Sequence, residues 1–450
     1  MKKTLVKVVS LICALAMVFS LAACGGKAPE ASDNNDAKTE APKADTSKEA
    51  AKEPVTLKLW SQFSDPKSTD GNFIAFYKSL DAIKTALPDI KIEHDGTEGE
   101  AYKTKIKTAM AANELPDIFF AWGAGFAEPM VKSGQVLPID EYLNDGTLDK
   151  VVPGTMVNFT YDGKVYGLPY SIAVASLYCN KELFDANSVK LPETYEDLVA
   201  AVKTFSSKGI TPIILGEKDL WPGLMPFGIL AARSAGAQGL SDALSKKASF
   251  DTPEMLEAAR KLKELSDLKA FGANAMGTSY NDSASAFKQG KGAMMYMGSW
   301  LNGDIEAEDS QVKGKVVPIK FPSLAGGKGN IDEFLGGSGE TFMISAQTKQ
   351  KEAAVKAVKF ICENMSKEQF LAGSGSPAWK GDMGDTSKLN QVSVQVSELT
   401  KSAKGFVYWL DVMVDSKSAE TIKNSIAQLI SNKVTPEQFC KDLQKMNSAQ

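Results

Sequence analysis

The stretch Val165–Asn180, VYGLPYSIAVASLYCN, is an uncharged run of sixteen residues between Lys164 and Lys181. It is rich in β-branched and aromatic side chains, and together with Gly167 and Pro169 this predicts buried extended chain rather than helix. Sixteen extended residues span about 50 Å, whereas a typical strand is about 17–20 Å long. One strand in one sheet therefore does not account for the run. A segment that leaves one domain and enters a second explains its length. The alternative is a long buried strand in a single α/β domain.

Strand and helix patterns alternate on both sides of this stretch. On its N-terminal side, strands are predicted at Val55–Trp60, Ile90–His94 and Asp117–Trp122, and helices at Phe73–Ala86 and Tyr102–Ala112. On its C-terminal side, we expect a helix capped by Thr194, a strand at Thr211–Leu215, helices at Pro222–Ala235 and Pro253–Leu265, a strand at Glu340–Ser345 and a helix at Lys349–Asn364. Such alternation predicts an α/β fold with parallel-type sheets covered by helices.

The residues around the stretch resemble a known family. Residues 162–169 read DGKVYGLP and lead into PYSIAVASLY at 169–178, with further matches at Leu115–Ile118, Gly134–Ile139 and Phe287–Trp300. In this order they resemble the extracellular sugar-binding proteins of ABC importers, over almost all of the chain from Val55 onward. The resemblance implies a two-domain periplasmic-binding-protein-like fold, in which each domain is a mixed sheet flanked by helices and crossover strands join the two. It implies an N-terminal lobe of residues 55–172 and 317–365, a C-terminal lobe of residues 173–316 and 366–450, and a return crossover at Val316–Phe321.

The N-terminus has the pattern of an export signal. Three lysines precede an uncharged segment, Val8–Ala23, which is close in length to a signal h-region and short for a membrane span. Leu21–Gly25, LAACG, resembles a bacterial lipobox, which implies a signal peptide at 1–23, lipidation of Cys24 and anchoring to the outer face of the cytoplasmic membrane, as in a Gram-positive-type bacterium. An ordinary signal peptide with a chance cysteine is the alternative. Residues 24–54 lack the apolar side chains that form a core, and we expect a disordered tether.

Composition excludes several classes of function. The 450-residue chain has a net charge of −4 and only two arginines, Arg233 and Arg260, which argues against nucleic-acid binding. A single histidine, His94, leaves little room for a histidine metal site or a catalytic triad. We find no cofactor motif and no catalytic motif, although 55 acidic residues leave a glycosidase carboxylate pair open. Cys179, Cys362 and Cys440 are expected to be buried free thiols.

The tryptophans are the positive signal for a binding site. A flat apolar ring suits the C–H face of a pyranose, and carboxylates and amides bind its hydroxyl groups. Ligands in open α/β sheets bind beyond the carboxyl ends of strands. All six tryptophans are predicted at strand ends or in loops, and the candidate site comprises Trp60, Trp122, Trp221, Trp300, Trp379 and Trp409 with the polar residues Gln62, Asp65, Glu98 and Glu340. The resemblance implies stacking aromatics near Trp300 and Trp409. The alternatives are tryptophans that cap the core and carboxylates in exposed turns.

These observations predict a lipid-anchored solute receptor. We expect a monomer that captures a carbohydrate, in particular an oligosaccharide, between its lobes by hinge closure and delivers it to an ABC permease pair with its ATPase. A surface-anchored carbohydrate-active enzyme and the binding component of a sugar-sensing system are the alternatives.

Overall fold

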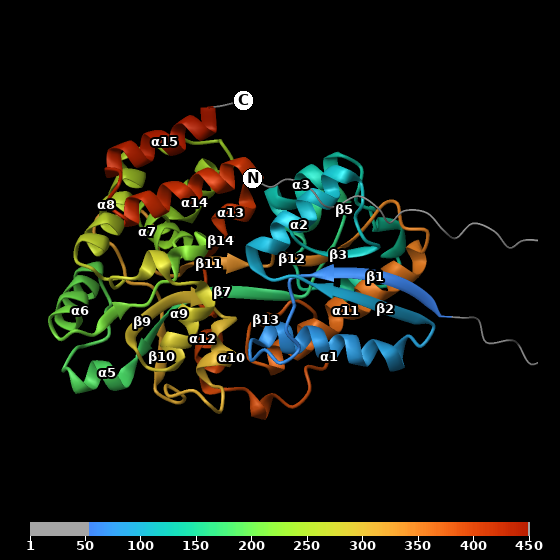
Figure 1. Ribbon diagram of the computed structural model, residues 1–450, viewed down its shortest axis with the longest axis horizontal. Coiled ribbons are helices and arrows are strands. Elements are labelled where there is room, and N and C mark those ends of the chain that lie inside the picture. The colour runs from blue at the N-terminus through green and yellow to red at the C-terminus, as the bar shows by residue number, and fades with distance from the viewer. Residues whose placement is uncertain (1–53, 449–450) are drawn as a thin grey trace, which may run out of the picture. The chain divides into compact units, whose positions relative to one another are not determined.

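The computed structural model describes residues 54–448 (Figure 1). The expected signal peptide, the Cys24 lipidation site and residues 24–53 of the expected tether lie outside this range. Within it the fold is α/β, as predicted, and the strands form two main sheets beside a small hairpin of β4 (Thr160–Tyr161) and β5 (Lys164–Val165). In this range no helix combines the length and the apolar composition that crossing a membrane requires.

The first sheet is mixed. Its order is β2-β1-β3-β12-β6, formed by β1 (Val55–Ser61), β2 (Ile90–Gly96), β3 (Ile118–Trp122), β12 (Glu340–Ile344) and β6 (Leu168–Pro169). Strand β1 runs parallel to β2 and β3, whereas β12 runs antiparallel to β3. All five residues of β3 are buried, as expected for a central strand covered on both faces. The three N-terminal strands predicted from the sequence are thus confirmed to within two residues.

Helices cover both faces of the first sheet. Figure 1 shows α1 and α11 on one face and α2 and α3 on the other, and α1 packs against α11. Their bounds are α1 (Gly71–Ala86), α2 (Gly99–Ala112), α3 (Ala124–Lys132), the one-turn α4 (Thr147–Lys150) and α11 (Lys351–Leu371). Helix α11 continues about two turns beyond the predicted end at Asn364, because it keeps burying one side, including Met365 and Gln369.

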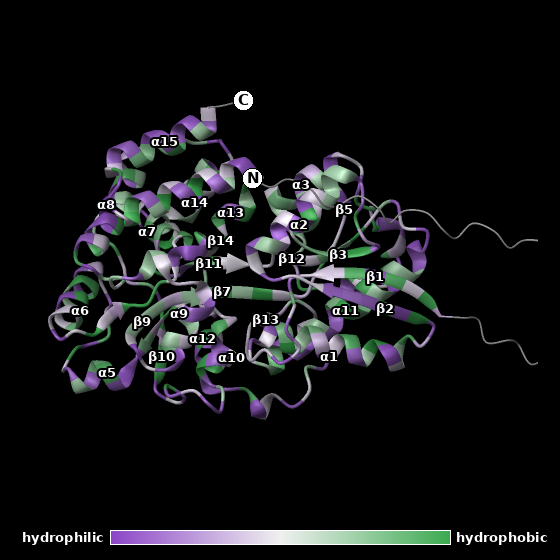
Figure 2. Cartoon of the chain, viewed as in Figure 1, coloured by the Kyte–Doolittle hydropathy of each residue, from purple (hydrophilic) through white to green (hydrophobic). Residues whose placement is uncertain are grey.

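Strand β7 (Ser171–Asn180) is the centre of the second sheet. The sheet order is β14-β11-β7-β9-β8, from β14 (Gly405–Val407), β11 (Glu333–Gly337), β7, β9 (Gly292–Gly298) and β8 (Thr211–Ile213), and β10 (Val316–Ile319) and β13 (Ser376–Pro377) also pair with β7. Nine of the ten β7 residues are buried, and Figure 2 shows the strand mainly at the hydrophobic end of the scale. Since β6 belongs to the first sheet, the chain changes sheets at Tyr170, inside the stretch predicted to cross over.

The return to the first sheet lies later than expected. The segment Val316–Phe321 was expected to be the return, but β10 pairs antiparallel with β7 and stays in the second sheet. The chain returns between β11 and β12, through Ser338 and Gly339. A Cβ on Gly339 would lie 1.9 Å from Cζ of Tyr408, so this backbone can pass the tyrosine ring only without a side chain. Ser338 and Gly339, directly after the last residue of β11, therefore form the second connection between the sheets.

Helices also surround the second sheet. Their bounds are α5 (Lys181–Ala186), α6 (Tyr195–Ser207), α7 (Leu224–Leu244), α8 (Pro253–Asp267), α9 (Tyr280–Lys288), α10 (Leu301–Ile305), α12 (Gln391–Thr400), α13 (Leu410–Met413), α14 (Ser416–Ile430) and α15 (Pro436–Ser448). The predicted cap at Thr194 is present as a capping box with Asp197. The predicted helix ending at Ala235 is the first part of α7, which kinks at Gly236. The three cysteines are buried and free, as expected.

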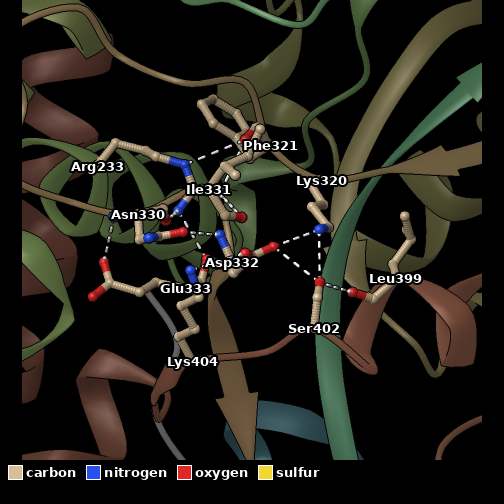
Figure 3. Close-up of polar contacts among 10 residues, drawn as sticks. All are labelled: Arg233, Lys320, Phe321, Asn330, Ile331, Asp332, Glu333, Leu399, Ser402 and Lys404. Carbon is tan, nitrogen blue, oxygen red and sulfur yellow. Dashed lines mark hydrogen bonds and ion pairs between the residues drawn. The ribbon is translucent and has the colours of Figure 1, made fainter.

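A buried arginine ties α7 to the loop between β10 and β11. Arg233 is 1% exposed, and its guanidinium donates hydrogen bonds to five backbone carbonyls. Figure 3 draws four of the acceptor residues. The acceptors are the carbonyl oxygens of Phe321, Pro322, Asn330, Ile331 and Glu333, at 2.8–3.3 Å. Since guanidinium stays charged in proteins, each of these bonds is charge-assisted. Arg233 therefore supplies the hydrogen-bond donors that these loop carbonyls would otherwise find in a helix or a sheet.

The two arginines give a matched test of this role. We expect Arg233→Ala to lower the free energy of unfolding by about 3–5 kcal/mol, because it leaves several buried carbonyls without donors. Arg260 lies on the surface, 3.0 Å from Glu437, and Arg260→Ala should cost at most about 1 kcal/mol. Urea unfolding followed by circular dichroism measures both. Equal, small losses would contradict the structural role of Arg233.

Candidate functional site

A cavity of about 430 Å³ lies where segments from both sheets meet. From the first sheet, it is lined by the loop after β1, the start of α2, the end of β3 and the start of β12; from the second, by the loop before α7, by α9 and α10, and by the segment into α13. The parallel strands β1 and β3 both direct their carboxyl ends toward it, which is the usual place for ligands in such sheets. The cavity is therefore the candidate binding site.

Four aromatic rings form one wall of the cavity. The ring centroid of Trp221 lies 4.9 Å from that of Tyr280 and 6.2 Å from that of Trp300, and the Trp300 ring lies 5.2 Å from Trp409. Trp300 lies two residues after the end of β9, and a Cβ on Gly298 would lie 2.1 Å from its ring, so the glycine makes room for the indole. Rings of this size offer the flat apolar faces on which a sugar can stack.

Two carboxyl groups, those of Asp70 and Asp304, also line the cavity. Asp70 caps α1 by accepting a hydrogen bond from the Asn72 backbone N–H at 2.7 Å. Burial, and then the negative charge of Asp304, raise the pKa of Asp70 to about 7. Burial also raises the pKa of Asp304, which accepts a hydrogen bond from Oγ1 of Thr69 at 2.5 Å. These carboxyls can accept hydrogen bonds from ligand hydroxyl groups.

A third carboxyl group connects the crossover with the cavity. Glu340 is the first residue of β12, and its Oε2 accepts a hydrogen bond from the hydroxyl of Tyr170 at 2.6 Å. Tyr170 is the residue at which the chain changes sheets. Burial raises the pKa of Glu340. The connection between the lobes therefore contacts a side chain of the candidate site directly.

Polar contacts also join the two sides of the cavity. Lys103 on α2 lies 2.9 Å from Asp411 on α13 and 3.0 Å from Glu100. Burial alone would lower the pKa of Lys103, but these two carboxylates outweigh it and raise the pKa above its usual range. Glu98 accepts a hydrogen bond from the side-chain amide of Asn281 at 2.9 Å. The Lys103 ammonium group is thus already paired with the two carboxylates of Glu100 and Asp411.

Most of the residues predicted for the site line this cavity. Those that do are Gln62, Asp65, Glu98, Trp122, Trp221, Trp300, Glu340 and Trp409. Trp60 and Trp379 do not. Trp60 precedes the last residue of β1 and lies under Lys105, whose Nζ is 4.4 Å from the ring centroid. Trp379 is 2% exposed, and its Nε1 donates to the carbonyl of Pro169 at 2.6 Å, so it is a core residue.

Several residues of the cavity were not predicted from the sequence. They are Asp70, Tyr280, Asn281, Lys103, Asp304 and Asp411. Asp70 had a usable signal, since it stands directly before a helix as an N-cap. The others lie on helices and look like ordinary surface residues until tertiary packing brings them to one place.

A buried glutamate supports the loop that carries Trp221. Glu217 is 0% exposed, and within residues 54–448 neither carboxylate oxygen has a hydrogen-bond partner. Burial raises the pKa of Glu217 to about 8. The side chain is therefore mostly protonated at neutral pH.

Among the described residues, no group of three or more His, Cys, Asp or Glu could hold a metal ion.

Two α/β lobes with a polar and aromatic cavity between them define a two-lobed binding protein. The chain belongs to the family of bacterial extracellular solute-binding proteins, whose model matches residues 70–368.

Individual relatives agree with this assignment. The chain is 27% identical to the multiple sugar-binding protein of Streptococcus mutans, over 61% of this chain and 65% of that one, so the match spans slightly less than two thirds of that curated relative. A solved structure from work on xylan utilisation by the thermophilic bacterium Caldanaerobius polysaccharolyticus is 40% identical, with a TM-score of 0.83 over 87% of this chain and all of that one. A chitin oligosaccharide binding protein is 26% identical, with a TM-score of 0.79 over 88% and 98% of the two chains.

Glu217 makes a testable contribution to the pH dependence of stability. In the unfolded chain it ionises near pH 4.5, whereas in the folded protein it stays protonated up to about pH 8. The folded state therefore binds an extra proton between these values, and stability falls as pH rises through this window. Glu217→Gln removes this loss, so the stability of the variant relative to wild type should rise between pH 4.5 and 8, by at most about 5 kcal/mol.

Urea unfolding across this pH range measures the difference. Glu114→Gln, a change of an exposed glutamate, is the control and should show no such trend. A pH-independent difference between wild type and Glu217→Gln would contradict a protonated Glu217.

Proposed function

We propose that this protein captures an oligosaccharide in the cavity and delivers it to an ABC permease pair with its ATPase. The observation that carries the proposal is the continuous wall of Trp221, Trp300 and Trp409 in a cavity that carboxyl and amide side chains also line. Rings stack on the apolar faces of sugars, and the polar groups accept and donate hydrogen bonds to hydroxyls. The family assignment and the printed names of the relatives, which mention multiple sugars, xylan utilisation and chitin oligosaccharide, support a carbohydrate ligand.

The proposed mechanism is closure of the lobes on the ligand. In the proposed arrangement, one lobe is built around the first sheet and the other around the second, and the return connection lies at residues 338–339 rather than at Val316–Phe321. A sugar that contacts the aromatic wall of one lobe and Asp70 or Glu340 of the other stabilises the closed form by its differential affinity for the two states. The permease then recognises the closed form. We further propose that the protein is an exported monomer, and that lipid on Cys24 holds it at the outer face of the cytoplasmic membrane.

Trp300 provides a test of the binding site. A thermal-shift screen over mono- and oligosaccharides should identify a ligand, since one present at 100 times its Kd stabilises by about 2.7 kcal/mol. Calorimetric titration should then show that Trp300→Ala weakens binding by about 1–3 kcal/mol, the range known for ring stacking on nucleic-acid bases.

Trp60→Ala is the matched control, because Trp60 lies outside the cavity, and it should bind as wild type does. Equal affinities of Trp300→Ala and wild type would remove Trp300 from the site. Release of shortened products from the oligosaccharides would favour an enzyme instead.

Anchoring gives an independent test. We expect Cys24→Ala to release the protein into the medium or to leave it unprocessed, because two acyl chains on Cys24 would supply the membrane affinity. Fractionation of cells and medium with an antibody against the folded part measures this. Membrane retention of a correctly cleaved Cys24→Ala protein would contradict the lipid anchor.

A further inference from the structure

The cavity carries a strong excess of negative charge. Seven carboxyl side chains line it, from Asp65, Asp70, Glu98, Glu100, Asp304, Glu340 and Asp411, against two lysines, Lys103 and Lys288. Lys103 is engaged by Glu100 and Asp411 at 3.0 and 2.9 Å. Lys288 lies 2.7 Å from Asp309, whose side chain is 75% exposed and is not part of the lining. Among the described lining residues there is no arginine, so a bound anion would find no uncommitted cation.

Asp70 and Asp304 place part of this charge beside the aromatic wall. Asp70, Asp304 and Tyr280 line the same cavity, and burial and then the charges of the two carboxyls raise the pKa of the Tyr280 hydroxyl. The Tyr280 ring is in turn 4.9 Å from Trp221. A sugar ring stacked on this wall therefore brings its substituents near the two carboxyl groups.

We propose that Asp70 and Asp304 are specificity-determining residues that exclude acidic sugars, so that the ligand is an oligosaccharide without uronic acid. This inference rests on the proposed function. Hydroxyl groups of a neutral sugar can donate to both carboxyls, whereas a uronate would bring a third negative charge into a partly dehydrated space. Like charges repel strongly at low effective dielectric, and such repulsion is a common means of rejecting a wrong ligand.

The test uses matched pairs of sugars. The probes are xylotetraose with and without a 4-O-methylglucuronic acid branch, and cellotetraose with and without oxidation of its primary hydroxyls to carboxylates. We expect at least one neutral member to bind and its acidic partner to bind at least tenfold more weakly at low ionic strength. Added salt should narrow the gap, because it screens charge repulsion.

Asparagine variants remove charge while keeping the hydrogen bonds. Asparagine is as good an N-cap as aspartate, so Asp70→Asn should keep the cap on α1. Asp304→Asn still presents an oxygen to the Thr69 hydroxyl. Each variant should reduce the ratio of acidic to neutral Kd at least threefold. Asp81→Asn, on the exposed side of α1 and outside the cavity, is the control and should leave the ratio unchanged.

The pH dependence of the ratio distinguishes charge from a merely structural role. The groups that act on Asp70 are Asp304 on α10, Glu340 on β12 and Tyr280 on α9, and Lys288 acts on Asp304. Because Asp70 ionises near pH 7, discrimination should increase from pH 6 to pH 8.5 in wild type. In Asp70→Asn this increase should be lost.

The outcomes separate this inference from the proposed function. Equal binding of acidic and neutral partners would overturn the inference and leave the sugar receptor standing. A ratio that neither asparagine variant changes would also overturn it. If no neutral sugar binds, the proposed function fails, and this inference fails with it.

Discussion

The structure depends on the burial of a single strand. Every backbone N–H and C=O of a buried strand needs a hydrogen-bond partner, and β7 has almost no surface exposed to water. It therefore pairs with β9, β10, β11 and β13, which come from four separate parts of the chain. Because β6 pairs with the first sheet directly before β7 begins, the same extended segment also fixes where the lobes join. The positions of Trp300, after β9, and of Glu340, after β11, follow from this pairing.

The connections between the lobes take part in the site itself. Tyr170 lies in the first connection and donates a hydrogen bond to Glu340, which opens the strand after the second connection. A change of angle between the lobes must therefore move side chains that line the cavity. Lys103, which lies between Glu100 and Asp411, adds an ion pair across the cavity that an opening motion would break. In the proposed receptor, ligand binding and lobe closure would be coupled through these contacts.

The site combines apolar rings with buried carboxyl groups. Burial raises the pKa values of Asp70 and Glu340, because a charged carboxylate loses hydration that the protein does not fully replace. A protonated carboxyl can both donate and accept, which suits the hydroxyl groups of a sugar. Arg233, in the other lobe, shows the opposite solution, since its buried charge is balanced by backbone carbonyls. The one deeply buried arginine among the described residues therefore has a structural role and does not line the cavity.

The sequence alone determined the class of fold, the crossover near Tyr170 and most of the tryptophans at the site, because these depend on local hydrophobic pattern and on residues next to strand ends. Only the tertiary structure decided the rest. The return connection was wrongly predicted at Val316–Phe321. The apolar pattern of β10 is the same whether the strand pairs within the second sheet or crosses to the first. Trp379 resembled a site residue, yet packing buries it in the core. Asp304 contacts Thr69, and Lys103 contacts Asp411, in each case a residue far away in the sequence. The packing of the lobes brings these residues together, and a local sequence pattern cannot predict it.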